Sequence, residues 1–342
     1  MDRKVLYLAL AAIFMSAAHS QQPQTPAPSA PAAAATAPAQ ARAAQQAPSA
    51  ASQPAQQGAA DDAAQKPFIF TVNEVPLIFT VTDGHGHYIP NLQQSDFALL
   101  DNQRAPQKVN RFRQQINLPL RVGLLIDTST SIHSRFQFEQ QSATEFLVEV
   151  LRARGDRAFV MGFDVTPNVT QDWTNNLDAL ETGVSRLKSG GGTALYDAIY
   201  TACRDKLLTS RGPEPVRKAM ILISDGDDNQ SRVYLNEAIK ECQRADTIIY
   251  SISTNWTPSR GPGDKVMQQL ADETGGEAFF PPNIEDMATS FSDIETELRS
   301  QYELDYTPAD FKTDGSFRNI YLYCYNRSYH VHARKGYFAP KD

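Results

Sequence analysis

The sequence predicts an α/β fold: a doubly wound, mostly parallel sheet inserted between N- and C-terminal β segments that form one small β-sandwich. Between residues 118 and 300, continuous apolar strand segments alternate with amphipathic helical segments. This alternation is typical of the crossover units that build a parallel sheet. Outside those bounds, residues 67–117 and 301–342 show only short β patterns. Each piece is too small to bury a core by itself, so we expect the two to pair.

The overall composition excludes several classes of protein. With 342 residues, 41% of them hydrophobic and 21% charged, the chain is not wholly disordered, collagen-like or a multi-span membrane protein. A formal net charge of -7 argues against nucleic acid as a partner, because phosphate binding needs a basic surface. Three cysteines without a C-x-x-C pair exclude a disulfide scaffold and a thiolate zinc knuckle.

Residues 1–20 have the layout of a secretory signal peptide. Arg3 and Lys4 precede an apolar run of 11 residues from Val5 to Met15, and small residues follow up to Ser20. We therefore expect an exported protein that is periplasmic, secreted or associated with the cell envelope, with no membrane span after cleavage. The apolar run is short for a spanning helix, which needs about 20 residues. An uncleaved N-terminal anchor is the alternative.

Residues 21–66 form a linker rich in alanine, proline and glutamine. They contain 19 Ala, 10 Gln and 7 Pro, with no aromatic or large aliphatic side chain. Such a segment cannot bury apolar area to offset its chain entropy, so we expect it to be disordered. The linker is either a spacer that holds the folded part away from a membrane or through a wall, or a tail without a function of its own. Composition does not distinguish the two.

The first β segment follows at residues 67–117. Runs rich in β-branched and aromatic residues predict strands over 68–72, 75–81, 96–100 and 108–112. The dipeptide Asp83-Gly84 marks a turn after the second run.

The predicted α/β domain spans residues 118–300. Apolar segments predict strands over 121–126, 158–163, 219–223, 248–252 and 278–280. Helical periodicity predicts helices over 136–151, 177–187, 195–202, 235–242, 266–271 and 287–298. The pair Gly275-Gly276 ends the fifth helix, as glycine does at many helix C-termini.

The C-terminal segment, residues 301–342, returns to β patterns and should pair with residues 67–117. Alternation over 302–306 predicts one strand. The runs 320–325 and 329–333 flank Asn326-Arg327-Ser328, which predicts a hairpin.

Oxygen-bearing side chains gather where the predicted parallel strands end. Asp127, Ser129 and Ser131 follow the first strand at i, i+2 and i+4, Thr193 follows a run of glycines, and Asp225 follows a third strand. Open α/β sheets bind ligands beyond the carboxyl ends of their strands. Carboxylates and hydroxyls are hard oxygen donors that suit Mg²⁺. They suit zinc poorly, because no histidine or cysteine is among them.

These five residues resemble the metal-ion-dependent adhesion site of von Willebrand factor type A domains, in the same order along the chain. The resemblance covers residues 118–300. The wider chain is similar to the VWFA-related domain family described in acidobacteria. That similarity depends on residues 80–83 and 96–97 upstream, and on residues 298–302 and 334–337 downstream.

The resemblance implies binding rather than catalysis. Asp127, Ser129, Ser131, Thr193 and Asp225 would hold Mg²⁺, with Mn²⁺ or Ca²⁺ as alternatives, directly or through water. An acidic residue of a protein partner would complete the shell, in an adhesion or scaffold role. Two further acidic residues, Asp227 and Asp228, would lie on the rim. Integrin β subunits have an acidic pair after the serines, whereas this chain has Ile132-His133-Ser134, so an adjacent second ion is not expected.

Two other functions compete with this interpretation. The first is a periplasmic assembly factor that recognises envelope proteins. The second is a metal-assisted hydrolase, since Asp127, Ser131 and His133 are close in the sequence. A G-x-S-x-G nucleophile motif is absent, and we expect the protein not to be an enzyme. The sequence does not specify the partner or the oligomeric state.

Two His-x-His pairs offer a second metal hypothesis. His85/His87 and His330/His332 have strand-like spacing in the two β segments, and four imidazoles could hold zinc if the segments adjoin. Turn and surface histidines are the favoured interpretation.

Cysteines and tyrosines leave two further questions open. Cys203 and Cys242 fall on predicted helices, and export permits a bridge between them, but buried free thiols fit equally well. Four C-terminal tyrosines fit either a stacking cluster for a carbohydrate or protein partner or, as favoured here, ordinary strand positions: Tyr321, Tyr323, Tyr325 and Tyr329.

Overall fold

A computed structural model describes most of the chain after residue 72. The described residues are 73–115, 118–130, 136–152, 155–210, 216–255, 257, 259–283 and 286–341. The predicted signal peptide (1–20), the linker (21–66) and the strand over 68–72 lie outside the described residues. The same is true of Ser131 and of the segment Ile132-His133-Ser134.

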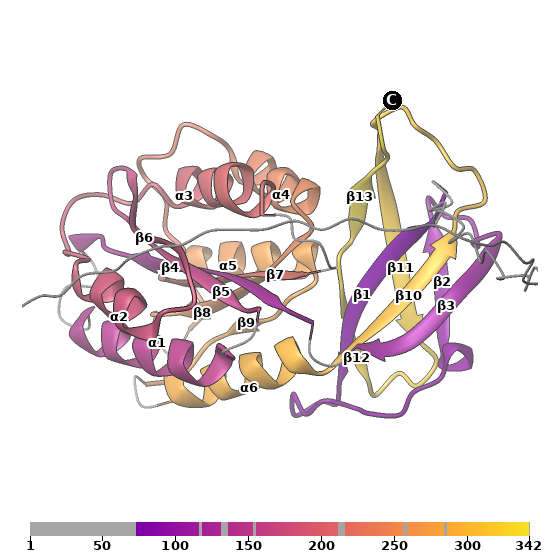
Figure 1. Cartoon of the computed structure of the whole chain (residues 1–342), viewed down its shortest axis with the longest axis horizontal. Helices are drawn as coiled ribbons and strands as arrows, with labels where there is room; N and C mark the ends of the chain where they lie inside the picture. The colour runs from indigo at the N-terminus through magenta and orange to yellow at the C-terminus, as the bar shows by residue number, and fades with distance from the viewer. Residues whose placement is uncertain are drawn as a thin grey trace, which may run out of the picture. The chain divides into compact units, whose positions relative to one another are not determined.

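The α/β part is built on a six-stranded sheet with the strand order β6-β5-β4-β7-β8-β9 (Figure 1). Its strands are β4 (Leu120–Asp127), β5 (Arg157–Phe163), β6 (Pro167–Thr174), β7 (Arg217–Ser224), β8 (Thr247–Ser253) and β9 (Ala278–Phe279). All neighbouring pairs are parallel except β5 with β6. The apolar strands β4 and β7 lie at the centre, where both faces of the sheet are covered.

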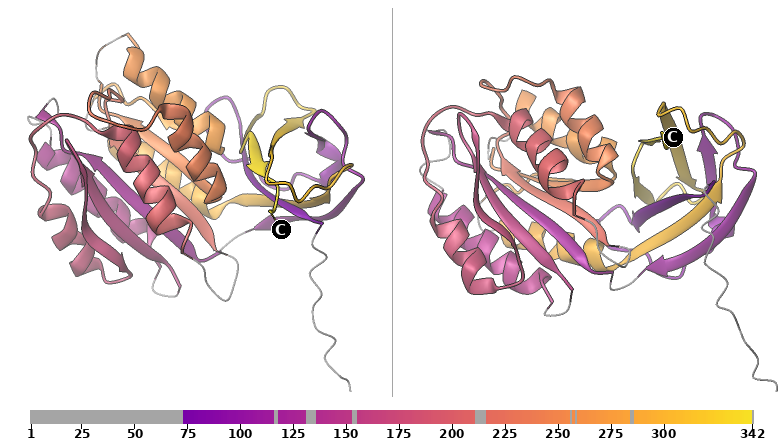
Figure 2. Two further views of the ribbon diagram at one scale, coloured as in Figure 1. Left: turned by 90° about the horizontal axis from the view of Figure 1, so that it is seen from above. Right: turned by 45° about the horizontal axis from the view of Figure 1, so that its top comes forward.

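Helices cover both faces of this sheet, as Figures 1 and 2 show. One face packs against α1 (Phe136–Val150), α2 (Leu177–Ser185) and α6 (Met287–Arg299). The other packs against α3 (Leu195–Thr201), its π-helical continuation η3 (Ala202–Leu207), α4 (Leu235–Arg244) and α5 (Pro262–Thr274). The predicted doubly wound fold is therefore confirmed.

The edge strand β6 was not predicted from the sequence. Its eight residues are mostly polar and none is fully buried, so the segment lacks the apolar run that marked the central strands. It pairs antiparallel with β5 and its register shifts twice. An edge strand contributes backbone pairing without burying both faces, and hydrophobic periodicity does not detect it.

The segments before β4 and after α6 form two antiparallel sheets around one core. The four-stranded sheet has the order β12-β1-β10-β3 and the three-stranded sheet has the order β13-β11-β2. The strands are β1 (Val75–Thr82), β2 (Phe97–Asp101), β3 (Lys108–Gln115), β10 (Gln301–Thr307), β11 (Phe317–Cys324), β12 (His330–Ala333) and β13 (Gly336–Phe338), and a 3-10 turn, η1 (Gln94–Asp96), precedes β2. Strand β1 pairs with both β10 and β12, so N- and C-terminal segments share the sandwich, as the predicted fold class required.

The predicted hairpin between 320–325 and 329–333 is wrong. Strand β11 pairs with β2 and β13, whereas β12 pairs with β1 in the other sheet. The side chain of Asn326 accepts a hydrogen bond from the backbone of Ser328, 3.1 Å away, and closes a local turn. Such a turn reverses the chain whether the following strand pairs with its predecessor or moves to the opposite sheet. Local sequence therefore could not distinguish the two.

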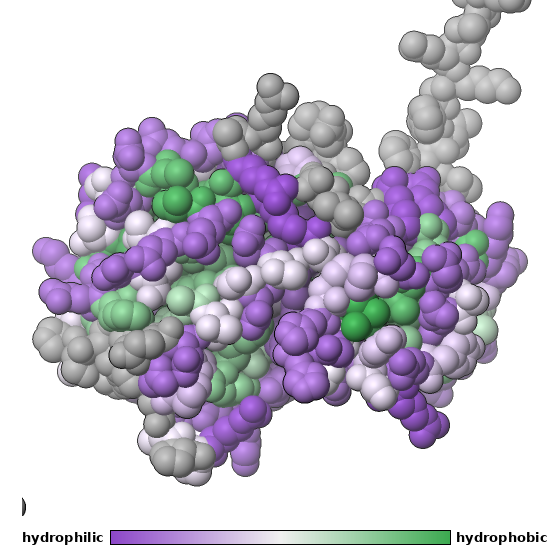
Figure 3. All heavy atoms as spheres, turned by 90° about the horizontal axis from the view of Figure 1, so that it is seen from below, coloured by the Kyte–Doolittle hydropathy of each residue, from purple (hydrophilic) through white to green (hydrophobic). Residues whose placement is uncertain are grey.

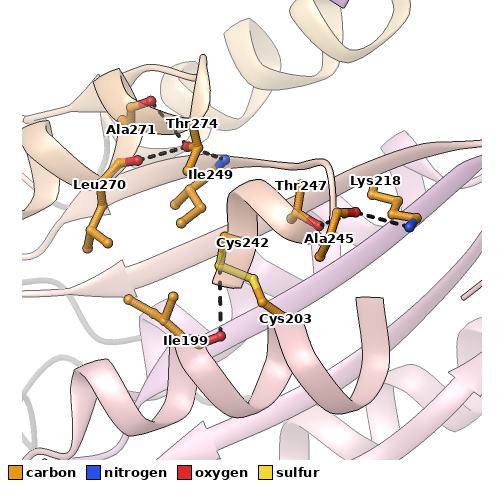
Figure 4. The surroundings of a disulfide bond; sticks show 10 residues. All are labelled: Ile199, Cys203, Lys218, Cys242, Ala245, Thr247, Ile249, Leu270, Ala271 and Thr274. Atoms are coloured by element: carbon orange, nitrogen blue, oxygen red, sulfur yellow. Dashed lines mark hydrogen bonds between the residues drawn. A yellow bond between two sulfur atoms is a disulfide. The ribbon is translucent and has the colours of Figure 1, made fainter. Parts of the chain in front are cut away.

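Cys203 and Cys242 form a disulfide that joins η3 to α4 (Figure 4). Both residues are completely buried in the core shared by α3, α4 and α5. This settles the question left open by the sequence in favour of a bridge. Cys324 is a free, half-buried thiol on β11.

The exposed tyrosines of β11 follow its alternation. Tyr321 and Tyr323 are 41% and 53% exposed, while Arg318 and Ile320 point into the sandwich. Tyr329 differs, since it packs against the β core. The exposed tyrosines of β11 thus match the expected pattern of a strand with one solvent-facing side.

On the face shown in Figure 3, hydrophobic residues lie in patches among hydrophilic ones.

Among the described residues of 73–341, no helix is both long and apolar enough to cross a membrane.

Candidate metal centre

Asp127 is the last residue of the central strand β4, and its side chain is held from two loops. It is completely buried. Its Oδ1 accepts a hydrogen bond from the backbone N–H of Ser129, at 2.8 Å, and its Oδ2 accepts one from the hydroxyl of Ser224, at 2.7 Å. These two bonds fix the orientation of the carboxylate at the end of the sheet.

Burial raises the pKa of Asp127 to about 6. Hydrogen bonds from Ser129 and Ser224 oppose the shift, and the nearby charge of Asp225 adds to it. The site therefore combines a desolvated carboxylate with a second acidic group. A bound cation would relieve both the desolvation cost and the mutual repulsion.

The loop after β4 contacts the glycine-rich loop before α3. The backbone N–H of Gly190 donates to the carbonyl of Thr128 at 2.6 Å. In the reverse direction, the backbone N–H and the hydroxyl of Thr130 both donate to the carbonyl of Gly191, at 3.3 and 2.9 Å. The segment that carries Ser129 is thus attached to the segment that carries Thr193.

Thr193 is in turn attached to the loop after β7. It is only 4% exposed. Its backbone N–H donates to Oδ1 of Asn229 at 2.9 Å, and its carbonyl accepts from the N–H groups of Asn229 and Gln230 at 3.0 Å. Three loops therefore meet through direct hydrogen bonds.

The third loop depends on a glycine pair. Gly226 has φ +81°, and a Cβ built there would lie 2.2 Å from the carbonyl oxygen of Gly263 at the start of α5. Its N–H donates to the Ser224 hydroxyl at 3.0 Å, the same hydroxyl that donates to Asp127. Glycine is needed both for the left-handed backbone and for the close approach of α5, which set the position of Asp225.

Four of the five predicted site residues lie on these connected loops: Asp127, Ser129, Thr193 and Asp225. Ser131 lies outside the described residues. The carboxylate and hydroxyl oxygens of these residues are donors of the kind that a hard divalent cation takes. Their role as ligands stays a prediction. The hydrolase alternative required Ser131 and His133, which both lie outside the described part of the chain.

Two residues that organise the site were not singled out from the sequence. Ser224 orients Asp127, and Asn229 holds the backbone of Thr193. Their position beside Asp225, directly after an apolar strand, was the available signal. A supporting role could not be deduced from it, because the contacts join residues 97 and 36 positions apart.

The two predicted rim residues differ from each other. Asp227 is exposed. Asp228 is half-buried and accepts hydrogen bonds from the backbone N–H of Tyr196 at 3.1 Å and from Ser231. Asp228 therefore anchors the start of α3 to the third loop, and only Asp227 is available to influence an approaching partner.

The two His-x-His pairs do not form one four-histidine cluster among the described residues. His85 and His87 gather with Asp83 on an exposed turn, and His332 gathers with Glu277 and Glu297. The expectation of surface histidines is wrong for His332, whose side chain is only 17% exposed, because β12 packs against the α/β part.

A family profile for the von Willebrand factor type A domain matches residues 122–295, just over half of the 342 residues. A UPF0353 protein of Mycolicibacterium gilvum is 23% identical over 202 residues, covering 52% of this chain and 60% of that protein. This chain thus aligns with less than two thirds of that relative.

Two solved structures are similar in part. The von Willebrand factor type A structure from Catenulispora acidiphila is 15% identical, covers 74% of this chain and 76% of its own, and has a TM-score of 0.44. Proximal thread matrix protein 1 from the mussel byssus, whose MIDAS motif is occupied by zinc, is 14% identical, covers 58% and 50%, and has a TM-score of 0.46. With the profile match and the sheet topology, the conclusion is that this chain belongs to the von Willebrand factor type A domain family.

Proposed function

We propose that this chain is an exported von Willebrand factor type A module that binds a protein partner through a divalent cation. Asp127, Ser129, Ser131, Thr193 and Asp225 would hold the ion, with Mg²⁺ as the expected species and Mn²⁺ or Ca²⁺ as alternatives. The observation that carries the proposal is Asp127: a fully buried carboxylate of raised pKa, held by Ser129 and Ser224 beside Asp225.

The charge balance of the site supports recruitment of an external carboxylate. Asp127 and Asp225 supply two negative charges, and the hydroxyls supply none. Mg²⁺ takes six oxygen ligands and keeps waters readily, so the five side chains leave room for a further ligand. An acidic residue of the partner protein would occupy it. The adhesion or scaffold role and the absence of catalysis are parts of this proposal.

Export is supported by the cysteines. The buried Cys203–Cys242 disulfide is a feature of proteins from oxidising compartments. It is consistent with the signal peptide expected over residues 1–20. Proteins of the envelope or the extracellular medium are therefore the partners to test, and these include the clients of an assembly factor.

Asp225→Asn should weaken Mg²⁺ binding by about 100-fold or more, because loss of even an outer-shell partner costs a metal site about 10–100-fold. Isothermal titration of the full chain with Mg²⁺ and Mn²⁺ measures this. The matched control is Asp227→Asn, two residues away on the same loop. It removes the same charge, but its backbone N–H still donates to Oδ1 of Asp225. Equal losses in both variants would show that only general loop charge matters and would contradict the proposed ligand set.

Binding of the protein partner should require the bound cation. In a pull-down of envelope and secreted proteins, a partner should be retained by the wild-type chain with Mg²⁺ and released by chelator. The Asp225→Asn variant should not retain it, whereas Asp227→Asn should. A partner that binds equally in chelator would show that the interaction does not use the cation.

Mg²⁺ affinity should also depend on pH. With the pKa of Asp127 raised to about 6, the ligand is ionised above that pH. Below it, a proton competes with the cation, so affinity should fall by up to about tenfold per pH unit. Titrations between about pH 8 and about pH 5 test this. A flat profile across that range would show that Asp127 does not exchange its proton for the ion.

A further inference from the structure

A second group of potential ligands lies where the C-terminal β segment meets the α/β part. Glu277 directly precedes β9, Glu297 lies in the last turns of α6, and His332 lies on β12. Their ligand atoms all lie within 4.8 Å of one another. Three elements far apart in the sequence therefore bring two carboxylates and an imidazole to one point.

Glu297 is the unusual member of this group. It is 2% exposed, and its Oε2 accepts no hydrogen bond from the described residues. One of its carboxyl oxygens lies within 4.8 Å of a carboxyl oxygen of Glu277. Burial, and next Glu277, raise the pKa of Glu297 well above its ordinary value. Two ionised carboxylates cannot share such a place, so either a proton or a cation must lie between them.

The nearby positive charge does not fill this role. A hydrogen bond with Tyr250 and, next, the charge of the buried Arg217 lower the pKa of Glu297. The guanidinium of Arg217 lies 3.4 Å from the Tyr250 hydroxyl, and no salt bridge joins it to Glu297 among the described residues. Its effect on the pKa of Glu297 is smaller than those of burial and of Glu277, so the excess of acidic groups remains.

His332 presents the right nitrogen to the carboxylates. Its Nδ1 lies 3.3 Å from the carbonyl oxygen of Gly276, which can only accept, so Nδ1 carries the hydrogen. Its Nε2 is then the lone-pair nitrogen. It accepts a hydrogen bond from the Thr82 hydroxyl at 3.1 Å and lies 3.7 Å from Oε2 of Glu277. A backbone carbonyl that orients the distal ring nitrogen is the usual outer shell of a metal-binding histidine.

We propose that Glu277, Glu297 and His332 bind Zn²⁺, which would join the α/β domain to the C-terminal β segment. One imidazole and two carboxylates suit zinc, whereas Mg²⁺ prefers oxygen ligands alone. Ligand atoms of one tetrahedral zinc lie roughly 3.4 Å apart. The His332–Glu277 separation of 3.7 Å is close to this, so only small side-chain rotations are needed.

Partial exposure gives the ion an entrance. The side chains of Glu277 and His332 are 28% and 17% exposed, so the buried Glu297 forms the floor of the site. Asp293, one helical turn before Glu297, is exposed. Burial and the charge of Glu277 raise its pKa, and His87 lowers it. This additional carboxylate would attract cations to the entrance.

The other histidine group on the described chain serves as a competitor in the test. Asp83, His85 and His87 also cluster, but both histidines are about four-fifths exposed. Asp83 already accepts backbone hydrogen bonds from His85 and His87, at 2.7 and 3.0 Å. An exposed group with a preoccupied carboxylate should bind zinc more weakly than the buried one.

The experiment is a Zn²⁺ titration of the full chain, freed of metal by chelator, with Asp127→Asn present throughout to silence the proposed Mg²⁺ site. We expect one tight equivalent of zinc and a rise in melting temperature. His332→Gln should weaken the affinity by about 100-fold or more and abolish the rise. Glu277→Gln keeps the side-chain shape at a partly exposed position and should have the same two effects. It serves as the second variant in case His332→Gln does not fold.

The double variant His85→Gln/His87→Gln is the matched control and should leave the tight site unchanged. Loss of zinc binding in this control, with His332→Gln unaffected, would overturn the proposal. So would unchanged affinity in Glu277→Gln. Because Asp127→Asn is present in every sample, the outcome is independent of the proposed Mg²⁺ function.

Discussion

Asp101→Ala should lower the free energy of unfolding of the sandwich by about 3–5 kcal/mol, the usual cost of breaking a buried ion pair from one side. The Asp101 carboxylate is completely buried and pairs with Arg318 at 2.7 Å, whose side chain is 1% exposed. It also accepts hydrogen bonds from the hydroxyls of Tyr306 and Tyr337, both at 2.8 Å. Removing it leaves the buried guanidinium with the partly exposed Asp310 as its remaining carboxylate partner among the described residues, and leaves two tyrosine hydroxyls without their acceptor.

The second carboxylate of Arg318 provides the control. Asp310 contacts the same guanidinium at 2.8 Å, but its side chain is 35% exposed. Asp310→Ala should therefore cost no more than about 1 kcal/mol, as at other solvent-screened pairs. Urea denaturation followed by tyrosine fluorescence and circular dichroism measures both variants. Equal effects would mean that Arg318 reaches water when Asp101 is removed, and that the pair does not organise the sandwich core.

Breaking the Cys203–Cys242 bridge should destabilise the α/β domain by about 4 kcal/mol. The bridge closes a loop with a sequence separation of 39, and the chain-entropy relation for a loop of that length gives about this value. The measurement is urea denaturation of the wild-type chain with and without a reductant. The unfolding midpoint should fall when the disulfide is reduced.

The double variant Cys203→Ala/Cys242→Ala separates the bridge from other effects of the reductant. It should unfold at lower urea than the oxidised wild type and should not respond to reductant. Cys324→Ala, at the half-buried free thiol, should still respond as the wild type does. A wild-type chain whose midpoint is unchanged by reductant, with three titratable thiols in denaturant, would refute the bridge and weaken the case for export.

Most of the α/β domain could be predicted because its elements carry strong local signals. The apolar strands β4, β5, β7 and β8 are buried on both sides, so their sequences are continuous runs of hydrophobic residues. Parallel strands end at one edge of a sheet. The residues at their carboxyl ends, Asp127 and Asp225, could therefore be assigned to one neighbourhood without knowing any contact.

The supporting contacts of the site were not predictable in the same way. Ser224 and Asn229 act through single hydrogen bonds across loops, and many serines and asparagines in turns make no such bond. The same limit applies to β12. Its turn chemistry fits a hairpin, but the strand is placed by pairing with β1, about 250 residues earlier in the chain.

By itself, the sequence determined the α/β class, because the alternation of apolar strands and amphipathic helices is a local property. It also determined which oxygen-bearing residues lie where the central strands end. Tertiary structure alone decided the Cys203–Cys242 bridge, the sheet that β12 joins and the meeting of Glu277, Glu297 and His332. These depend on distances between segments that are remote along the chain. Such distances are set by packing of the two cores and leave no mark in any short stretch of sequence.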